Sequence, residues 1–245
     1  MLLAACKVLD KLKPVIGENT DPEPSEGHLC LPVQYTYSFP EALQKFSCSE
    51  FLWLWRQQIR LYLEGTGINS VPVDLHEQQL SLNQHSRAFN LKESEALGPQ
   101  LLPVVIGESL SSRVSYYEIS VGDGPWEKQK SSGLNLCTGT GSKARFFNIN
   151  RVATQVVEDL VEKVANEYNE SLLYSPEEPK ILFSIREPIA TEFSQAVLSI
   201  VCVRSCCWDA CMVVDGGTTF EFNDGAIALM MINKEDELRI VLLEQ

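Results

Sequence analysis

The sequence lacks any long uninterrupted apolar run. The longest candidates are residues 196–203 and an interrupted run over residues 226–232, whereas a helix that crosses a bilayer needs about 20 apolar residues. Basic residues are also scarce, since 20 Lys and Arg stand against 33 Asp and Glu for a net charge of −13. Phosphate backbones and anionic bilayers attract clustered Lys and Arg. The composition therefore excludes a helical membrane span and disfavours nucleic acid and membrane surfaces as partners.

Histidine is nearly absent. The chain has 3 His, at positions 28, 76 and 85, all within polar segments. A hydrolase of the Ser-His-Asp type would also need a nucleophile such as the Ser of G-x-S-x-G, and that motif does not occur. Triad catalysis therefore has little support.

Cysteine is more frequent, with 8 residues. The spacing of Cys202, Cys206, Cys207 and Cys211 does not match a paired zinc motif, and no His lies within a hundred residues. This favours free, partly buried thiols in a reducing compartment, with a zinc site as the alternative.

A chain of 245 residues with 44 % apolar side chains has room for one large domain or two smaller ones. Residues 2–12 show apolar positions on one face and predict an amphipathic helix without the features of a signal or transit peptide. Residues 14–17 predict a short buried strand, and a loop rich in turn residues follows as far as Gly27. Ligands bind at the carboxyl ends of such strands, so residues 17–27 form either a ligand loop or a plain surface loop.

The remaining pattern divides the chain into three parts. Periodicity predicts helices over residues 39–63 and 151–168, and a polar, aperiodic insertion or linker over residues 76–100. The predicted strands cover residues 101–106, 115–121, 133–137, 180–185, 196–204, 210–214, 218–222, 227–232 and 238–243. We therefore expect an α/β domain at residues 1–100 with a helical or loop insertion, a β-rich domain at 101–222, and strands at 223–245 that return to the core.

The segment Thr138-Gly-Thr-Gly-Ser-Lys-Ala144 is the most informative for function. It follows a strand and precedes a helical pattern, so that backbone amides, hydroxyls and the Lys143 charge can converge on a phosphate or ribose. The segment matches neither the P-loop nor the G-x-G-x-x-G fingerprint, and a flexible connection remains the alternative. Asp215-Gly, by contrast, predicts a type I′ hairpin more than a functional carboxylate.

Three segments in this order resemble the NAD kinases, namely Pro14-Val-Ile-Gly17-x-Asn19, Ser132-Gly-Leu through Ala144, and Val213-Val-Asp215-Gly. The closing stretch is most similar to the mitochondrial members of animals. The resemblance implies an incomplete N-terminal α/β (Rossmann-like) domain that binds nucleotide, and a C-terminal antiparallel β domain that binds NAD. It also implies ATP-dependent phosphorylation of the 2′-hydroxyl of NAD to give NADP, with Mg²⁺ and a homodimer. A mitochondrial location is implied as well, with a cytosolic one as the alternative because no transit peptide is recognisable.

The resemblance carries over to individual positions only in part. Thr140, Gly141, Ser142 and Ala144 match the Thr-Gly-Ser-x-Ala loop that lines the NAD site of the family, and Lys143 stands where many members have Thr. Ser132 takes the place of an Asp, and Gly17 and Asn19 match a first-domain loop that faces the nucleotide. The binding residues implied are Gly17, Asn19, Ser132, Thr140, Gly141, Ser142, Lys143 and Ala144.

Departures from the family bear on catalysis. Its Gly-Gly-Asp-Gly-Thr, which holds the catalytic Asp, would lie upstream of Met1, so we expect the isolated chain to have no catalytic residue and to be weakly active or inactive. The family's Asn-Glu pair is replaced by Leu101-Leu-Pro-Val-Val-Ile-Gly107, and the connection at residues 158–161 is shorter than in the family. Three hypotheses follow: an NAD kinase, a catalytically inactive relative that binds nucleotide or dimerises with itself or with a full-length enzyme, and a chain that does not fold stably.

Overall fold

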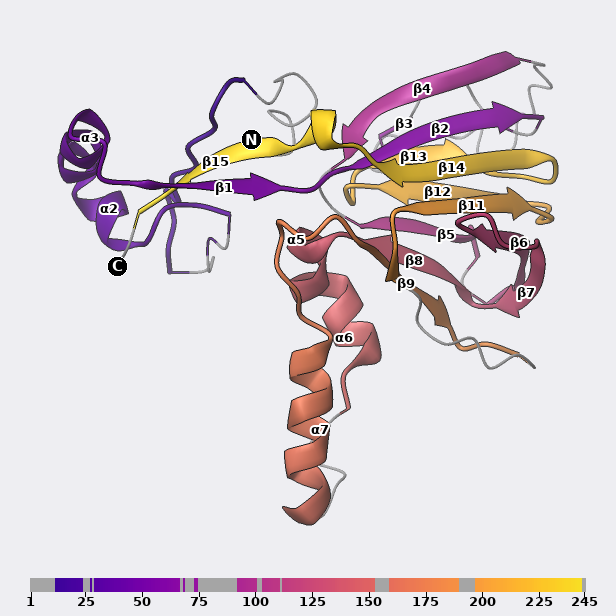
Figure 1. Ribbon diagram of the computed structural model, residues 1–245. Helices are drawn as coiled ribbons and strands as arrows, with labels where there is room; N and C mark the ends of the chain where they lie inside the picture. The colour runs from indigo at the N-terminus through magenta and orange to yellow at the C-terminus, as the bar shows by residue number, and fades with distance from the viewer. Residues whose placement is uncertain are drawn as a thin grey trace.

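The structure is a computed structural model and describes residues 12–23, 27, 29–66, 68, 73–74, 92–100, 103–110, 112–152, 159–189 and 197–243. Met1 and the helix predicted over residues 2–12, except for Leu12, lie outside the described residues. Two large antiparallel sheets pack against each other, and a smaller body lies at one end of them (Figure 1). The fold is rich in strands and has few helices in the part described.

The first large sheet has seven strands, and its pairings are antiparallel. In sheet order they are β10 (Val197–Leu198), β9 (Ile181–Arg186), β8 (Gly133–Cys137), β5 (Val104–Glu108), β12 (Ala210–Val214), β13 (Thr218–Glu221) and β3 (Val73–Asp74). The hairpin between β12 and β13 turns at Asp215 and Gly216, whose φ angles of 53° and 72° are those of a type I′ turn. The predicted Asp-Gly hairpin is confirmed.

The second large sheet has six strands, also antiparallel. In sheet order they are β4 (Lys92–Gln100), β2 (Ile59–Gly65), β14 (Ala226–Ile232), β11 (Ile200–Ser205), β6 (Ser115–Val121) and β7 (Glu127–Ser131). Alternate residues of β2, β6, β11 and β14 face the first sheet, as Ile59, Leu61 and Leu63 do in β2. They meet buried side chains of β5, β8 and β12 in one apolar core, as the period of two in a strand requires.

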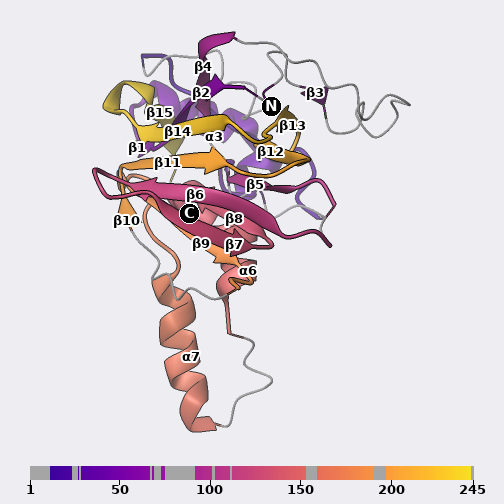
Figure 2. The same cartoon turned by 90° about the vertical axis from the view of Figure 1, so that its right-hand side faces the viewer.

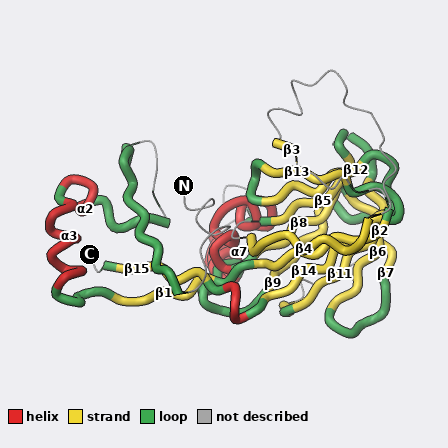
Figure 3. The backbone as a smooth tube through the Cα atoms, turned by 90° about the horizontal axis from the view of Figure 1, so that it is seen from above, coloured by secondary structure: helices red, strands yellow, loops and turns green. Residues whose placement is uncertain are grey.

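The smaller body consists of α2 (Gln34–Tyr37), α3 (Phe39–Ser47) and the antiparallel pair β1 (Leu52–Arg56) and β15 (Leu238–Leu242), to which Val15 adds an isolated parallel bridge. It has a small core of its own around Tyr35 and Leu243. Figure 3 shows it set off from the large sheets, with α7 (Asp159–Ser171) lying nearer to them. In Figure 2, α7 projects away from the sheets.

Two predictions of secondary structure are wrong. The helix predicted over residues 39–63 ends at Ser47, and the rest forms β1 and β2, because a dense run of apolar and aromatic residues satisfies both periods and here pairs with β15 and β14. The linker predicted over residues 76–100 contains β4, a strand at the edge of its sheet that pairs with β2. Residues 76–91 lie outside the described residues.

The buried strand predicted over residues 14–17 is reduced to the isolated bridge of Val15, and Ile16 is exposed. The predicted elements from residue 101 onward agree with the structure apart from their bounds. The strand predicted over residues 196–204 is divided into β10 and β11, which belong to different sheets. The helix predicted over residues 151–168 is seen as α7, and residues 153–158 lie outside the described part. Strands β2 and β4 lie within residues 1–100 but belong to the six-stranded sheet, whereas β15 pairs with β1 in the smaller body. The division at residues 100 and 222 stays a prediction.

The described cysteines are free thiols, as predicted, and the burial of Cys137 makes stability depend on pH. Burial raises the pKa of Cys137 to about 12 and that of Tyr117 to about 12. A raised pKa in the folded state means that stability is complete below the unfolded pKa, near 9 for the thiol, and is lost as the pH rises toward 12. The unfolding free energy should therefore fall by about 1.4 kcal/mol for Cys137 alone between pH 8 and 10.

Urea unfolding at pH 8, 9 and 10 measures this loss. Cys137→Ala removes the titrating thiol, so its unfolding free energy should fall less steeply with pH than that of the unchanged protein. Exposed Cys48→Ala serves as the matched control and should keep the original pH dependence. Equal slopes for the three proteins would contradict the assignment.

Candidate functional site

The candidate loop begins where the buried strand β8 ends. Thr138 is still extended, and its carbonyl oxygen accepts hydrogen bonds from the N–H groups of Gly141 at 2.9 Å and Ser142 at 3.0 Å. The chain therefore turns directly into the short helix α5 (Gly139–Gly141), the π-helical turn η1 (Ser142–Phe146) and α6 (Phe147–Asn150). A π-helical turn of this kind is frequent at functional sites.

Close packing accounts for both glycines of the loop. A Cβ atom on Gly139 would lie 2.2 Å from the carbonyl oxygen of Ser175, and one on Gly141 would lie 2.9 Å from the ring of Pro103. Neither position has room for a side chain. The glycines allow the loop to approach neighbouring backbone, which is a structural requirement that holds without any ligand.

The hydroxyl groups of the loop are divided between two roles. Ser142 is fully buried, and its Oγ donates to the carbonyl oxygen of Gly139 at 2.8 Å, which closes the loop on itself. Thr140 is only half-buried, and Lys143 is exposed. Thr140 and Lys143 are therefore the side chains of this loop best placed to meet a ligand.

Arg56, the last residue of β1, lies against this loop. Its Nη1 donates to Thr140 Oγ1 at 3.2 Å, although the two residues are 84 positions apart in the sequence. The Arg56 residue is only 8 % exposed, its Nε is buried without a partner, and burial lowers the pKa of its guanidinium. Sequence analysis missed Arg56, because the helix predicted over residues 39–63 gave it no neighbour in the Thr138–Ala144 loop.

Two glutamines fix this position of Arg56. The N–H of Gln57 donates to the carbonyl oxygen of Pro176 at 2.9 Å, and its Nε2 donates to the carbonyl oxygen of Glu177 at 3.1 Å. Gln58 Nε2 donates to the carbonyl oxygen of Asp236 at 2.7 Å. The link between β1 and β2 is therefore held on both sides, and Figure 1 shows it beside α5.

The chain is similar over its whole length to proteins called NAD kinase 2, mitochondrial. It is 75 % identical to the protein of Rattus norvegicus over 279 residues and 59 % identical to that of Xenopus tropicalis over 293 residues, and it covers 66 % and 69 % of them respectively. With the Mus musculus protein the identity is 69 %, over 67 % of its length. The chain belongs to the NAD kinase family. No family model matches it.

The chain spans about two thirds of the rat relative's length and 63 % of the human one. The alignment with the rat protein runs over 279 residues, more than the 245 of this chain, so the relative has internal residues without a counterpart here. This agrees with the internal losses expected from the sequence.

Solved structures of NAD kinases share the fold. The yeast NADH kinase complexed with NADH gives a TM-score of 0.59 at 14 % identity and covers 86 % of this chain and 49 % of its own. An NAD kinase from Archaeoglobus fulgidus in complex with ATP gives 0.58 at 16 % identity, over 99 % of this chain and 73 % of its own. The predicted fold class is confirmed.

The residues that match the family motifs do not all meet at the loop. Ser132 precedes β8, whereas Thr140 follows it, and the strand between residues 132 and 138 separates them by roughly 20 Å. Ser132 Oγ instead donates to Glu187 Oε2 at 2.5 Å. The structure therefore brings Arg56 to Thr140 but places Ser132 at the other end of the strand.

Gly17 and Asn19 lie in the smaller body. The carbonyl oxygen of Gly17 accepts from the N–H of Leu31 at 2.8 Å, and that of Asn19 accepts from Thr36 Oγ1 at 2.7 Å. These bonds join the loop to the segment that enters α2. Ala144 lies in η1.

The catalytic Asp of the family is expected upstream of Met1, so the structure does not test its position. Met1 itself lies outside the described residues, which begin at Leu12. That no catalytic residue lies within this chain therefore stays a prediction.

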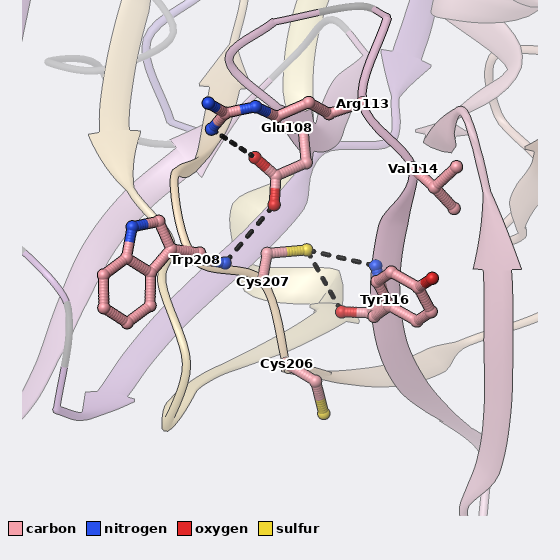
Figure 4. A pocket seen from close by; sticks show the side chains of 7 residues that line it. All are labelled: Glu108, Arg113, Val114, Tyr116, Cys206, Cys207 and Trp208. Carbon is pink, nitrogen blue, oxygen red and sulfur yellow. Dashed lines mark hydrogen bonds and ion pairs between the residues drawn. The ribbon is translucent and has the colours of Figure 1, made fainter.

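A second concave site lies on the large sheets (Figure 4). Its volume is about 540 Å³, and Glu108, Arg113, Val114, Tyr116, Cys206, Cys207 and Trp208 line it. Its polar groups engage one another: Glu108 Oε1 accepts from the N–H of Trp208 at 3.3 Å, and Cys207 Sγ contacts the main chain of Tyr116. Burial raises the pKa of Cys207 to about 11, so its thiol stays protonated near pH 7 and is not a nucleophile.

Neither a metal cage nor a membrane helix is found among the described residues. No three His, Cys, Asp or Glu side chains there come close enough to hold an ion together. Proteins usually hold Mg²⁺ through one or two carboxylates together with substrate phosphates. The Thr140 loop and Arg56 supply hydroxyls and bases without a carboxylate, so they do not fit the ion by themselves. No described helix is long and apolar enough to span a bilayer.

Proposed function

We propose that this chain binds NAD at the loop from Thr138 to Ala144 and serves the reaction of its family, the ATP-dependent phosphorylation of the 2′-hydroxyl of NAD to give NADP. The observation that carries the proposal is family membership over the whole chain. The retained loop supports it, because Arg56 contacts the Thr140 hydroxyl and the exposed Lys143 lies in the same loop. The proposed substrates are nucleotides, with ATP as phosphoryl donor.

The chemistry available at this loop is binding and orientation. Phosphoryl transfer depends mainly on positioning and on neutralising the charge of the phosphates. Thr140 can donate its hydroxyl proton to an anionic oxygen, while Lys143 and Arg56 offset negative charge; Ser142 is occupied in closing the loop. The sequence contains no Gly-Gly-Asp-Gly, and we assign no general base within this chain.

A second candidate is a catalytically inactive relative that binds nucleotide or dimerises. It is favoured by the segment Leu101-Leu-Pro-Val-Val-Ile-Gly107, which stands where the family has its Asn-Glu pair, and by the internal residues of the relatives that have no counterpart here. The names of the relatives support a mitochondrial location for either candidate. A homodimer is proposed from family resemblance alone.

Calorimetric titration with NAD, together with an assay for NADP in the presence of NAD, ATP and Mg²⁺, separates the two candidates. We expect NAD to bind, and Thr140→Ala to weaken that binding about 3- to 10-fold through loss of one hydrogen bond. The exposed Ser112→Ala is the matched control and should bind NAD unchanged. Absence of NAD binding would overturn the proposal, and binding without NADP formation would select the inactive relative.

A further inference from the structure

Four arginines in the described part of the chain have partners that suit a guanidinium, and Arg56 does not. Arg60 makes a two-pronged ion pair with Asp236, and Arg204 pairs with Glu118 at 2.8 Å. Two others are held by several weaker partners: Arg113 has two carboxylates within 4 Å, and Arg239 lies over two tryptophan rings. Arg56 is more buried than Arg60 or Arg204, yet its one partner among the described residues is the hydroxyl of Thr140.

This arrangement leaves most of the guanidinium unsatisfied. Arginine carries five N–H donors and stays charged in proteins, and in the described part of the chain only one donor of Arg56 has an acceptor. A buried charge without a counter-ion is unfavourable, as the lowered pKa of Arg56 reflects. A neutral donor would position Thr140 without that cost. The charge itself therefore requires an explanation.

We infer that Arg56 and Thr140 form an oxyanion site that takes a phosphate group of a nucleotide. The planar guanidinium presents parallel N–H groups that match two oxygens of a phosphate. The identification of the anion as nucleotide phosphate rests on the proposed function, whereas the need for an anion rests on the buried charge of Arg56.

The contacts of the site define how the anion is held. Thr140 Oγ1 accepts from Arg56 Nη1, so the hydroxyl proton of Thr140 remains available for the anion. Arg56 Nε is fully enclosed, whereas Nη2 is not among the fully enclosed atoms and has no partner in the described residues. The anion is therefore bound at the Nη edge, on the side of Thr140. The hydrogen bonds of Gln57 and Gln58 keep that edge in place before the ligand arrives.

The inference is tested with Arg56→Met, which keeps the volume of the side chain and removes its charge, and with Arg204→Met as the matched control. The probes are inorganic pyrophosphate, NAD and adenosine, which lacks phosphate. Pyrophosphate should raise the Tm of the unchanged protein and of Arg204→Met. Arg56→Met should have a Tm no lower than that of the unchanged protein without anion, show no response to pyrophosphate, and bind NAD at least 10-fold more weakly. Adenosine binding should not change.

The outcomes separate this inference from the proposed function. Pyrophosphate and NAD responses in Arg56→Met equal to those of the unchanged protein would overturn the inference and leave NAD binding intact. A response to pyrophosphate that depends on Arg56, without any binding of NAD, would support the site and overturn the proposed function. No response of the unchanged protein to either probe would overturn both.

A second variant covers a failure to fold. Arg56→Lys keeps the charge and should retain part of the pyrophosphate response. If Arg56→Met and Arg56→Lys both fail to fold, the side chain is structural, and the inference is overturned.

Discussion

Replacing Gly139 with alanine is expected to lower the free energy of unfolding by about 3 kcal/mol, because the added Cβ conflicts with main chain that cannot move aside cheaply. The nearest atoms to that Cβ are the carbonyl oxygen of Ser175 at 2.2 Å and its carbon at 2.6 Å. Relief of this conflict requires α5 to move away from Ser175. Thr140 follows Gly139 directly, so NAD binding should weaken as well.

Gly217→Ala is the matched control. A Cβ on Gly217 meets nothing within 4 Å, and its φ angle is not in the left-handed region, so the change should stay within about 0.5 kcal/mol. Urea unfolding of the three proteins measures the difference. An unfolding free energy of Gly139→Ala equal to that of Gly217→Ala would show that the loop and Ser175 are not packed as described.

The glycines of this loop also show why sequence could predict the site only in part. Alternating glycines and hydroxyls after a strand indicate a ligand loop, and the loop does lie at the end of β8 beside a buried cation. The pattern does not reveal that Gly139 and Gly141 are required by Ser175 and Pro103, which lie far away in the sequence. Local pattern identified the segment, and tertiary contacts decide what each residue does.

Arg56 is the other part that sequence could not supply. Its role depends on a contact 84 positions away and on the strand β1, which the helical periodicity of residues 39–63 concealed. The same physical cause underlies the error at β4, a polar strand formed because β2 offers it an edge. Strands such as β6 and β12 were predictable, because their alternating or β-branched residues and adjacent turns agree with the final pairing.

Arg60 provides the opposite case to Arg56 on the adjoining strand. Arg60 Nε donates to Asp236 Oδ2 at 2.6 Å and its Nη2 bonds the other oxygen, which ties β2 to the turn η3 (Lys234–Asp236). The side chain of Asp236 is 4 % exposed. Arg60→Met would leave this carboxylate buried and unpaired, so the free energy of unfolding should fall by about 3 kcal/mol.

A double-mutant cycle in urea unfolding measures the pair. Asp236→Asn removes the unpaired negative charge that Arg60→Met leaves behind. The double variant Arg60→Met with Asp236→Asn should therefore recover most of the lost unfolding free energy, and the coupling energy should exceed about 1 kcal/mol. We therefore expect Arg60→Met to destabilise the protein. Arg56 has no carboxylate partner in the described part of the chain, so we expect Arg56→Met not to destabilise it. Independent, additive effects at Arg60 and Asp236 would contradict the pairing. A large loss of stability in Arg56→Met would remove the contrast on which the anion site depends.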